Sequence, residues 1–472
     1  MLFNSLDYLV FLFIILVLFW SIPHKYNRYK VVLLVLSSYF FYACWDWRFL
    51  SLIIFSSLVD YILGIKIHNA KKYKKTLLSI SLICNIGLLL IFKYYNFFID
   101  SFQELFSFAG SEVGFQTIHI ILPVGISFYT FQTLSYTIDI YRGVLKPTKN
   151  PVVFFCYVSF FPQLVAGPIE RAKDLLPQLE KLKKFNTHKF SDGIRQIIWG
   201  LFKKVVIADN CGYYVNDIFS NIESSSSTTL IIGAIYFSMQ IYADFSGYSD
   251  IAIGTAKLFN INFSSNFKYP FFSRNISEFW RRWHISLSSW FRDYLYFPLG
   301  GNRNGIRKHI LNLFIIFTVS GFWHGANFTF IAWGVLHFLY YLPELILKLN
   351  KNNIEFENSL KLKNFLKMIY TFSIVSLAFI FFRAENITQA LNYIIGIFSN
   401  GIDDISSDLN FNLILLLITF MFLIEWKNRH KDHGLAIKNS KLFNYISLIA
   451  TIFMIFEFGM FRSPSDFIYF NF

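Results

Sequence analysis

The feature that most constrains this chain is the alternation of long apolar runs with short clusters of lysine and arginine. Early runs lie near residues 6–22, 31–44, 49–65 and 76–92, and later ones near 310–322, 326–345, 368–382, 411–425 and 442–460. With their flanks, these runs approach the ~20 residues that cross a bilayer as a helix. The pattern predicts an all-α, polytopic membrane protein with roughly 10–12 transmembrane or re-entrant helices.

Composition and charge agree with a membrane protein. The chain is 55% hydrophobic and 20% aromatic but only 15% charged, which is outside the usual range of soluble proteins. The net charge of +14 does not indicate nucleic acid, because the basic residues fall between apolar runs. Basic loops at Pro23–Lys30, Lys66–Lys75 and Lys427–Lys441 are expected on the cytoplasmic side, so both termini are expected outside.

The regularity of the runs divides the chain into three segments. Residues 1–117 are expected to form N-terminal transmembrane helices, with an external loop from Lys93 to Gln116, and residues 346–472 C-terminal helices and an external tail. In residues 118–345, proline and glycine interrupt the apolar stretches repeatedly. Broken helices at membrane depth need protein or a water-filled cavity to satisfy their backbone groups. This middle segment is therefore predicted to hold the active core.

Two histidines in the middle segment are the main functional signal. His284 lies in WRRWHIS and His324 in GFWHGAN, both in aromatic surroundings. An ionisable group at membrane depth is a functional candidate, and imidazole can accept and return a proton near neutral pH. The alternative is a structural role, because buried histidines also hydrogen-bond between helices.

Arginines accompany the first histidine. Trp280, Trp283, Leu287 and Trp290 repeat at helical spacing, which predicts one amphipathic helix ending at Pro298. Guanidinium groups near it can bind a phosphorylated acyl donor, or they are ordinary cytoplasmic charge. The donor candidates are Arg281, Arg282, Arg292 and Arg303.

Other polar residues in apolar surroundings have open roles. Asp244 and Asp250 are expected to orient a histidine, to pair with an arginine, or to form a structural ion pair. Gly325 and Asn327 either line the site or make a tight turn between helices. The four cysteines show no ligand spacing, so no metal site is expected.

Several longer motifs resemble the membrane-bound O-acyltransferases, specifically the bacterial alginate O-acetyltransferase-like branch. The motifs are SFYTFQTLSYTIDIYRG (Ser127 to Gly143), FPQLVAGPIER (Phe161 to Arg171), YADFSGYSDIAIG (Tyr242 to Gly254), WRRWHISLSSWFRDYLYFPLGGNR (Trp280 to Arg303), FWHGANFTFIAWG (Phe322 to Gly334) and FFRAENITQA (Phe381 to Ala390). No GxSxG, Walker, HExxH or GxGxxG signature competes with them.

The resemblance implies a multi-pass enzyme of the bacterial cytoplasmic membrane with a central tunnel. It implies that His324 is the catalytic histidine and His284 the second functional one, and that acetyl-CoA is the acyl-donor substrate, with no permanently bound cofactor. The acceptor is then a polysaccharide such as an alginate-like exopolysaccharide or peptidoglycan, reached with a separate extracytoplasmic SGNH-type transferase. Tyr469, in the aromatic C-terminal tail, becomes a possible acyl relay, or else it is an interfacial anchor.

Two other functions stay open at this point. A teichoic-acid D-alanyl transferase of the same family takes its acyl group from a carrier protein. A transporter of polysaccharide or lipid-linked sugar belongs to another class, and it should show an internal repeat, which this sequence lacks, and no histidine pair.

Overall fold

The computed structural model describes residues 1–110, 114, 117, 120–164, 167–348, 361–402, 409–437, 441–461 and 467–468. Within these residues the regular structure is helical and contains no strand. The all-α prediction is confirmed. The chain forms two compact units, the first made of Met1–Phe190 with Ala256–Phe263 and the second of Ser191–Thr255 with Ser264–Phe472. The three functional segments named from sequence remain a prediction.

Several helices are long and apolar enough to cross a membrane. Among the described residues, four stretches meet this criterion by length and composition: His24–Asn69, Lys74–Phe108, Phe328–Ile346 and Leu362–Arg383. Three shorter apolar helices accompany them, at Leu6–Ser21, Ile387–Ser399 and Leu442–Phe458. The multi-pass organisation predicted from the apolar runs is present.

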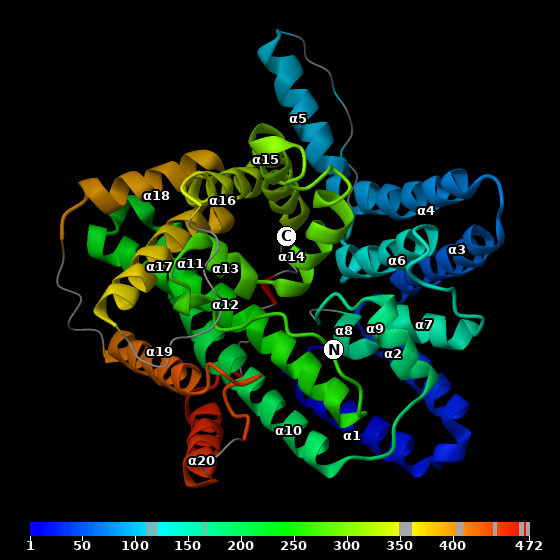
Figure 1. Cartoon of the computed structure of the whole chain (residues 1–472). Coiled ribbons are helices and arrows are strands. Elements are labelled where there is room, and N and C mark those ends of the chain that lie inside the picture. Colours follow the sequence, from blue (N-terminus) through cyan, green and yellow to red (C-terminus); the bar gives the residue numbers. More distant parts are fainter. Residues whose placement is uncertain are drawn as a thin grey trace. The chain divides into compact units, whose positions relative to one another are not determined.

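The first unit is a helical bundle with buried polar contacts. Its helices are α1 (Leu6–Ser21), α2 (Asn27–Asp46), α3 (Leu50–Asn69), α4 (Lys74–Leu89), α5 (Tyr95–Phe108), α6 (Ile126–Tyr141), α7 (Pro151–Ser159), α8 (Phe161–Leu164) and α9 (Ala172–Glu180) (Figure 1). Asp60 of α3 accepts hydrogen bonds from Ser81 Oγ at 2.5 Å and Asn85 Nδ2 at 2.7 Å, both on α4. Such bonds join helices where lipid supplies no hydrophobic driving force.

The loop predicted for Lys93–Gln116 is wrong from Lys93 to Phe108, which are helical, whereas its external placement stays a prediction. The chain continues from α4 through a π-helical turn at Leu90–Tyr94 into α5, which runs to Phe108. Phe98, Phe102 and Leu105 recur at i, i+4 and i+7, and this apolar stripe favours a helix despite the acidic residues between them.

The second unit contains the remaining helices. They are α10 (Thr187–Leu201, which begins in the first unit), α11 (Asp209–Ser220), α12 (Ser227–Leu258, which ends in the first unit), α13 (Ile276–Arg282), α14 (Ile285–Phe291), α15 (Gly305–His324), α16 (Phe328–Ile346), α17 (Leu362–Arg383), α18 (Ile387–Ser399), α19 (Leu409–Lys427) and α20 (Lys441–Phe458). Two π-helical turns, Phe202–Ala208 and Arg292–Tyr296, extend α10 and α14.

Helices α15 and α16 form a tight hairpin, seen side by side in Figure 1. A Cβ on Gly321 would lie 2.2 Å from the Phe330 carbonyl oxygen, and one on Gly334 would lie 2.3 Å from that of Phe317. Glycine at both positions therefore lets the two backbones touch. Helix α15 ends at His324, and the hairpin places His324 against α16.

The single amphipathic helix predicted from Trp280 to Pro298 is also wrong. It is broken into α13 and α14 at His284, whose backbone is left-handed at φ 42°. The Ile285 amide donates to the Asn266 carbonyl at 2.9 Å, and His284 Nδ1 lies 3.0 Å from Asn266 Oδ1. A non-glycine residue holds such a conformation only when its surroundings fix it, and Asn266 supplies that constraint.

Candidate active site

His284 is held at the break between α13 and α14. It is fully buried, and besides Asn266 it contacts the ring of Phe245 on α12 at a centroid distance of 4.6 Å. Its Nε2 atom makes no hydrogen bond to any described residue. One ring nitrogen is thus oriented by the protein, and the other faces the aromatic interior.

His324 closes α15 within a ring of aromatic side chains. Its ring centroid lies 5.0 Å from that of Trp323, 5.2 Å from Trp333 and 5.3 Å from Phe382. The centroids of His324 and His284 are 6.2 Å apart. The structure therefore brings together the two histidines singled out from sequence, which we call the histidine pair. Their chemical roles stay a prediction.

The turn after His324 has a structural explanation. A Cβ on Gly325 would lie 2.1 Å from the Phe330 ring, so the position excludes larger side chains. The side-chain oxygen of Asn327 caps α16 by accepting a hydrogen bond from the backbone amide of Thr329 at 2.9 Å. The Asn327 side-chain nitrogen donates to the backbone carbonyl of Glu385. Of the two roles considered for these residues, the tight turn is the one observed.

Another buried histidine, His337, lies outside the motifs that sequence reasoning singled out. It lies on α16, thirteen residues after His324, and is fully buried. Its ring centroid lies 4.7 Å from that of Trp333 and 5.0 Å from that of Trp280. The available signal was one ionisable side chain within the apolar run WGVLHFLYYL, which is a functional candidate by itself.

A cavity of about 570 Å³ lies along α15 in the second unit, and we call it the arginine-lined cavity. Arg281 and Arg292 line it, together with His309 near the start of α15 and Ser320 one turn before His324. The other lining residues are Ser277, Trp280, Ile285, Ser288, Ser289, Phe291, Tyr296, Asn302, Leu313, Ile316, Phe317 and Tyr341. From His309 to Ser320 the helix rises about 16 Å.

The four arginines named from sequence differ in placement. Arg281 and Arg292 line the arginine-lined cavity, whereas Arg282 and Arg303 do not. The Arg282 guanidinium is fully buried and donates to Glu278 Oε1 at 2.6 Å, one helical turn earlier. Arg282 is thus paired within the protein, and the donor-binding role predicted for these arginines stays a prediction.

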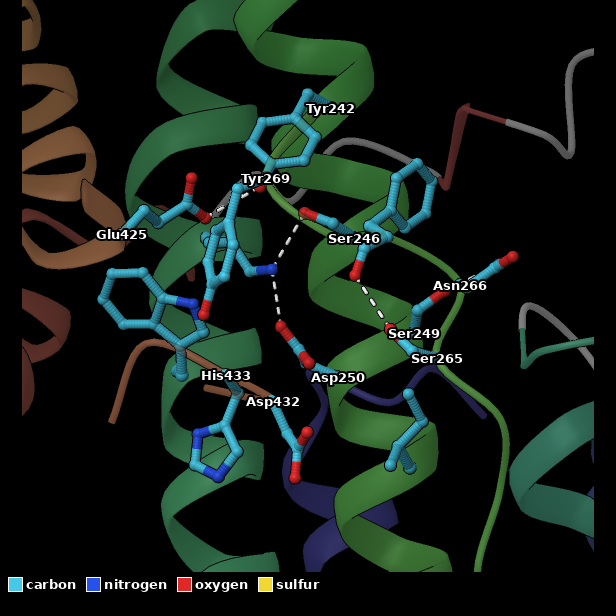
Figure 2. A pocket seen from close by; sticks show the side chains of 14 residues that line it. Tyr242, Ser246, Ser249, Asp250, Ser265, Asn266, Tyr269, Glu425, Asp432 and His433 are labelled. Atoms are coloured by element: carbon cyan, nitrogen blue, oxygen red, sulfur yellow. Dashed lines mark hydrogen bonds and ion pairs between the residues drawn. The ribbon is translucent and has the colours of Figure 1, made fainter. Parts of the chain in front are cut away.

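Asp244 and Asp250 pair with lysines. Lys204 Nζ lies 2.9 Å from Asp244 and 2.8 Å from Asp209, and all three side chains are buried. Lys203 Nζ donates to Asp250 Oδ2 at 2.5 Å and to Ser246 Oγ at 2.9 Å, the two contacts drawn at the centre of Figure 2. Asp244 and Asp250 therefore form ion pairs, as one of the predicted alternatives had it, but their partners are Lys204 and Lys203 and not arginines.

The ion pair of Lys203 borders a small cavity of about 20 Å³, which has room for about one water molecule. Figure 2 shows Glu425 beside Tyr242 on one side of this cavity and Asn266 beside Ser249 on the other. Asn266 also holds His284, so the same residue supports both this polar cluster and the histidine pair.

The C-terminal tail reaches the same region of the second unit. Phe467 is buried, with ring centroids 4.4 Å from Tyr248 and 6.0 Å from Phe245. The Ile468 amide donates to Asp244 Oδ2 at 2.7 Å. Phe245 thus contacts both the tail and His284. Tyr469 follows directly but lies outside the described residues.

Comparison with known proteins identifies the family. The sequence model of MBOAT, the membrane-bound O-acyltransferase family, matches residues 148–383. The chain belongs to this family. A probable alginate O-acetylase of Pseudomonas putida is 40% identical over 396 residues, which cover 83% of this chain and 80% of that protein. A peptidoglycan O-acetyltransferase of Helicobacter pylori is 34% identical over 494 residues, or 93% of this chain and 91% of its own.

A third relative is matched less extensively. The teichoic acid D-alanyltransferase of Bacillus subtilis is 30% identical over 234 residues, which cover 46% of this chain and 58% of that protein. As a membrane-bound O-acyltransferase, the protein is a multi-pass membrane enzyme. The transporter alternative is therefore wrong. The segment matched by the family model contains His284, His324 and His337 and every residue that lines the arginine-lined cavity.

Proposed function

We propose that the protein takes acetyl groups from cytoplasmic acetyl-CoA and delivers them across the membrane for O-acetylation of a cell-envelope or exported polysaccharide. Relatives that match most of this chain are named as a probable alginate O-acetylase and a peptidoglycan O-acetyltransferase, which supports an acetyl group and a glycan acceptor. We place the enzyme in the bacterial cytoplasmic membrane with both termini outside, because the basic loops mark the cytoplasmic side.

One observation carries the proposal: the arginine-lined cavity has Arg281 and Arg292 in its wall and also includes Ser320, which lies one helical turn before His324. Its volume lies within the range of about 300–1,000 Å³ that is usual for small-molecule sites. Arg281 and Arg292 would hold the phosphates of the donor, because guanidinium groups bind phosphate with charge-assisted hydrogen bonds. Ser320 lies one helical turn from His324, so an extended donor arm would bring its thioester to the imidazole.

His324 is the proposed general base. It removes the proton of an attacking hydroxyl, whose oxygen forms a bond to the carbonyl carbon of the acetyl thioester. When the carbon–sulfur bond breaks, the imidazolium returns that proton to the departing thiolate. The products are an acetyl ester and free coenzyme A thiol. The aromatic rings around His324 exclude water, which would otherwise hydrolyse the thioester.

His284 is the proposed second functional histidine. Its Nδ1 is fixed by Asn266, so the ring has a defined orientation, and its centroid lies 6.2 Å from that of His324. We propose that it orients the acceptor hydroxyl. Its left-handed backbone and its buried partner give it the rigidity that such a role requires.

Tyr469 is the proposed first acceptor, which passes the acetyl group to a separate extracytoplasmic SGNH-type transferase. The buried Phe467 and the Ile468–Asp244 hydrogen bond hold the preceding residues of the tail in the second unit, beside Phe245. A phenyl acetate is more activated than an alkyl ester, so it can transfer its acyl group to a serine or sugar hydroxyl.

The test is donor binding by the purified full chain. We expect saturable binding of acetyl-CoA by isothermal titration, and acetyl transfer to a glycan when the partner transferase is present. A D-alanylated carrier protein is the matched alternative donor, suggested by the D-alanyltransferase relative. Transfer supported by the carrier protein, with no binding of acetyl-CoA, would overturn the proposal.

A further inference from the structure

Three aromatic rings form a compact cluster between the arginine-lined cavity and His324. They belong to Trp280 on α13 and to Trp333 and His337 on α16, and we call them the three-ring cluster. The centroid distances are 4.7 Å for Trp333 and His337, 5.0 Å for Trp280 and His337, and 5.7 Å for the two tryptophans. Each ring therefore contacts the other two.

All four ring nitrogens of this cluster are buried and make no hydrogen bond to any described residue. They are the two indole Nε1 atoms and both imidazole nitrogens of His337. Buried polar atoms are nearly always paired in folded proteins, because leaving them unpaired costs stability. The two indole N–H groups and at least one imidazole N–H group are donors, and three such donors in one cluster point to a ligand group that accepts hydrogen bonds there.

The position of the cluster indicates which group this is. Trp280 lines the arginine-lined cavity, and Trp333 contacts the ring of His324 at a centroid distance of 5.2 Å. A thioester that enters from the cavity and reaches His324 must therefore come beside these rings. Its carbonyl oxygen is a hydrogen-bond acceptor and becomes negatively charged during attack.

We propose that His337, Trp280 and Trp333 form an oxyanion site that binds the carbonyl oxygen of the acyl donor next to His324. This proposal rests on the proposed function, because it requires the donor in the arginine-lined cavity. As the hydroxyl oxygen attacks, the carbonyl π electrons move onto oxygen, and the ring N–H groups hydrogen-bond to the resulting oxyanion. The electrons return when the carbon–sulfur bond breaks. No proton is exchanged with the three-ring cluster.

The surroundings make these donors effective. His337 and Trp333 are buried, and Phe279 and Phe379 cover the imidazole at centroid distances of 6.0 Å and 6.5 Å. Preorganised donors in a water-excluded site stabilise a developing charge far more than the same groups in water. An indole nitrogen is only a donor, and an imidazole always carries at least one N–H group.

The decisive variant is His337→Phe, which keeps an aromatic ring against the same neighbours but removes both nitrogens. A purely structural ring would tolerate this change, and stability should hold or rise because two unpaired nitrogens are lost. For an oxyanion site we expect kcat to fall by about 10²–10³-fold. Acetyl-CoA affinity should stay within about threefold, since the donor bonds strengthen only in the transition state.

Two further variants keep the test valid if His337→Phe does not fold. Trp280→Phe and Trp333→Phe each remove one indole N–H group, and each should lower kcat by about tenfold or more without a matching change in acetyl-CoA affinity. Trp199→Phe is the control, because Trp199 is as buried as Trp333 and stacks on Phe202 with a centroid distance of 5.2 Å. Among the described residues, its ring contacts none of His284, His324 and His337. Its turnover should stay unchanged.

The outcomes separate this proposal from the proposed function. Unchanged kcat in His337→Phe, or in both tryptophan variants, overturns the oxyanion site while leaving the donor assignment intact. Failure of the unchanged protein to bind acetyl-CoA overturns the proposed function first. The pH profile is a second readout: His337→Phe should lower kcat equally at every pH, because His337 transfers no proton in the proposed step.

Discussion

Removing the Arg281 side chain should weaken acetyl-CoA binding more than removing that of Arg292. Arg281 is partly buried in the cavity wall, where its Nη2 donates to Ser277 at 2.8 Å. The Arg292 side chain is 58% exposed and already pairs with Asp293 at 2.9 Å. The first guanidinium is therefore fixed by Ser277 in a partly buried position, and the second is more exposed to water and paired with Asp293.

The expected loss of acetyl-CoA affinity differs in size between Arg281→Ala and Arg292→Ala. A charge-assisted hydrogen bond in a shielded site contributes about 1.5–3 kcal/mol, so Arg281→Ala should raise the Kd for acetyl-CoA by roughly 10–100-fold. An exposed ion pair contributes about 1 kcal/mol or less, so Arg292→Ala should raise Kd by less than about fivefold. The Arg292 effect should also shrink in high salt, because exposed charges are screened.

The assay is equilibrium binding of acetyl-CoA to purified variants at two salt concentrations. Arg307→Ala is the control, because Arg307 is exposed in the same basic region but does not line the arginine-lined cavity. Its Kd should stay unchanged. Equal affinities for Arg281→Ala and the unchanged protein would refute the placement of the donor phosphates in this cavity.

The remaining predictions concern stability, topology and the tail. Lys204→Met leaves two buried carboxylates without their cation, so thermal unfolding in detergent should show a loss of about 3–5 kcal/mol; an unchanged melting temperature would contradict the buried ion pair. An impermeant external thiol reagent should not label Lys72→Cys but should label Asp404→Cys, and the reverse pattern would invert the topology. Tyr469→Phe should keep acetyl-CoA binding but stop glycan acetylation, and intact-mass analysis of the unchanged protein should show an acetyl group on the C-terminal peptide. Normal glycan acetylation by Tyr469→Phe would make the tail an anchor only.

Hydropathy alone predicted most of the membrane architecture. The runs near 49–65 and 326–345 are α3 and α16 almost as expected, because lipid forces apolar segments of this length into helices. The same reasoning failed at α5, where scattered acidic residues suggested a loop. A helical apolar stripe outweighs a few charges that can point to solvent.

The break at His284 was beyond sequence reasoning. The repeat from Trp280 to Trp290 fits one helix, and only the contacts with Asn266, eighteen residues earlier, interrupt it. Tertiary contacts of this kind override local periodicity, and they cannot be read from spacing. The pairing of His284 with His324 was predictable as chemistry, but their 6.2 Å separation was not.

The positions of the candidate site residues could be predicted only in part, because sequence spacing does not give tertiary contacts. Arg281 and Arg282 are adjacent in sequence and were equivalent there, yet one lines the arginine-lined cavity and the other is buried against Glu278. His337 was passed over because it stands without a polar motif around it. The role proposed for His337 depends on the contacts of its ring with Trp280 on α13 and Trp333 on α16.

The most direct test of the account is acetyl transfer by His324→Ala. The variant should insert in the membrane and bind acetyl-CoA as the unchanged protein does, since His324 does not line the cavity that is proposed to hold the donor. Loss of the general base should lower the rate of glycan acetylation by about 10²–10⁴-fold or more. Near-normal glycan acetylation by a well-expressed His324→Ala variant would contradict the account.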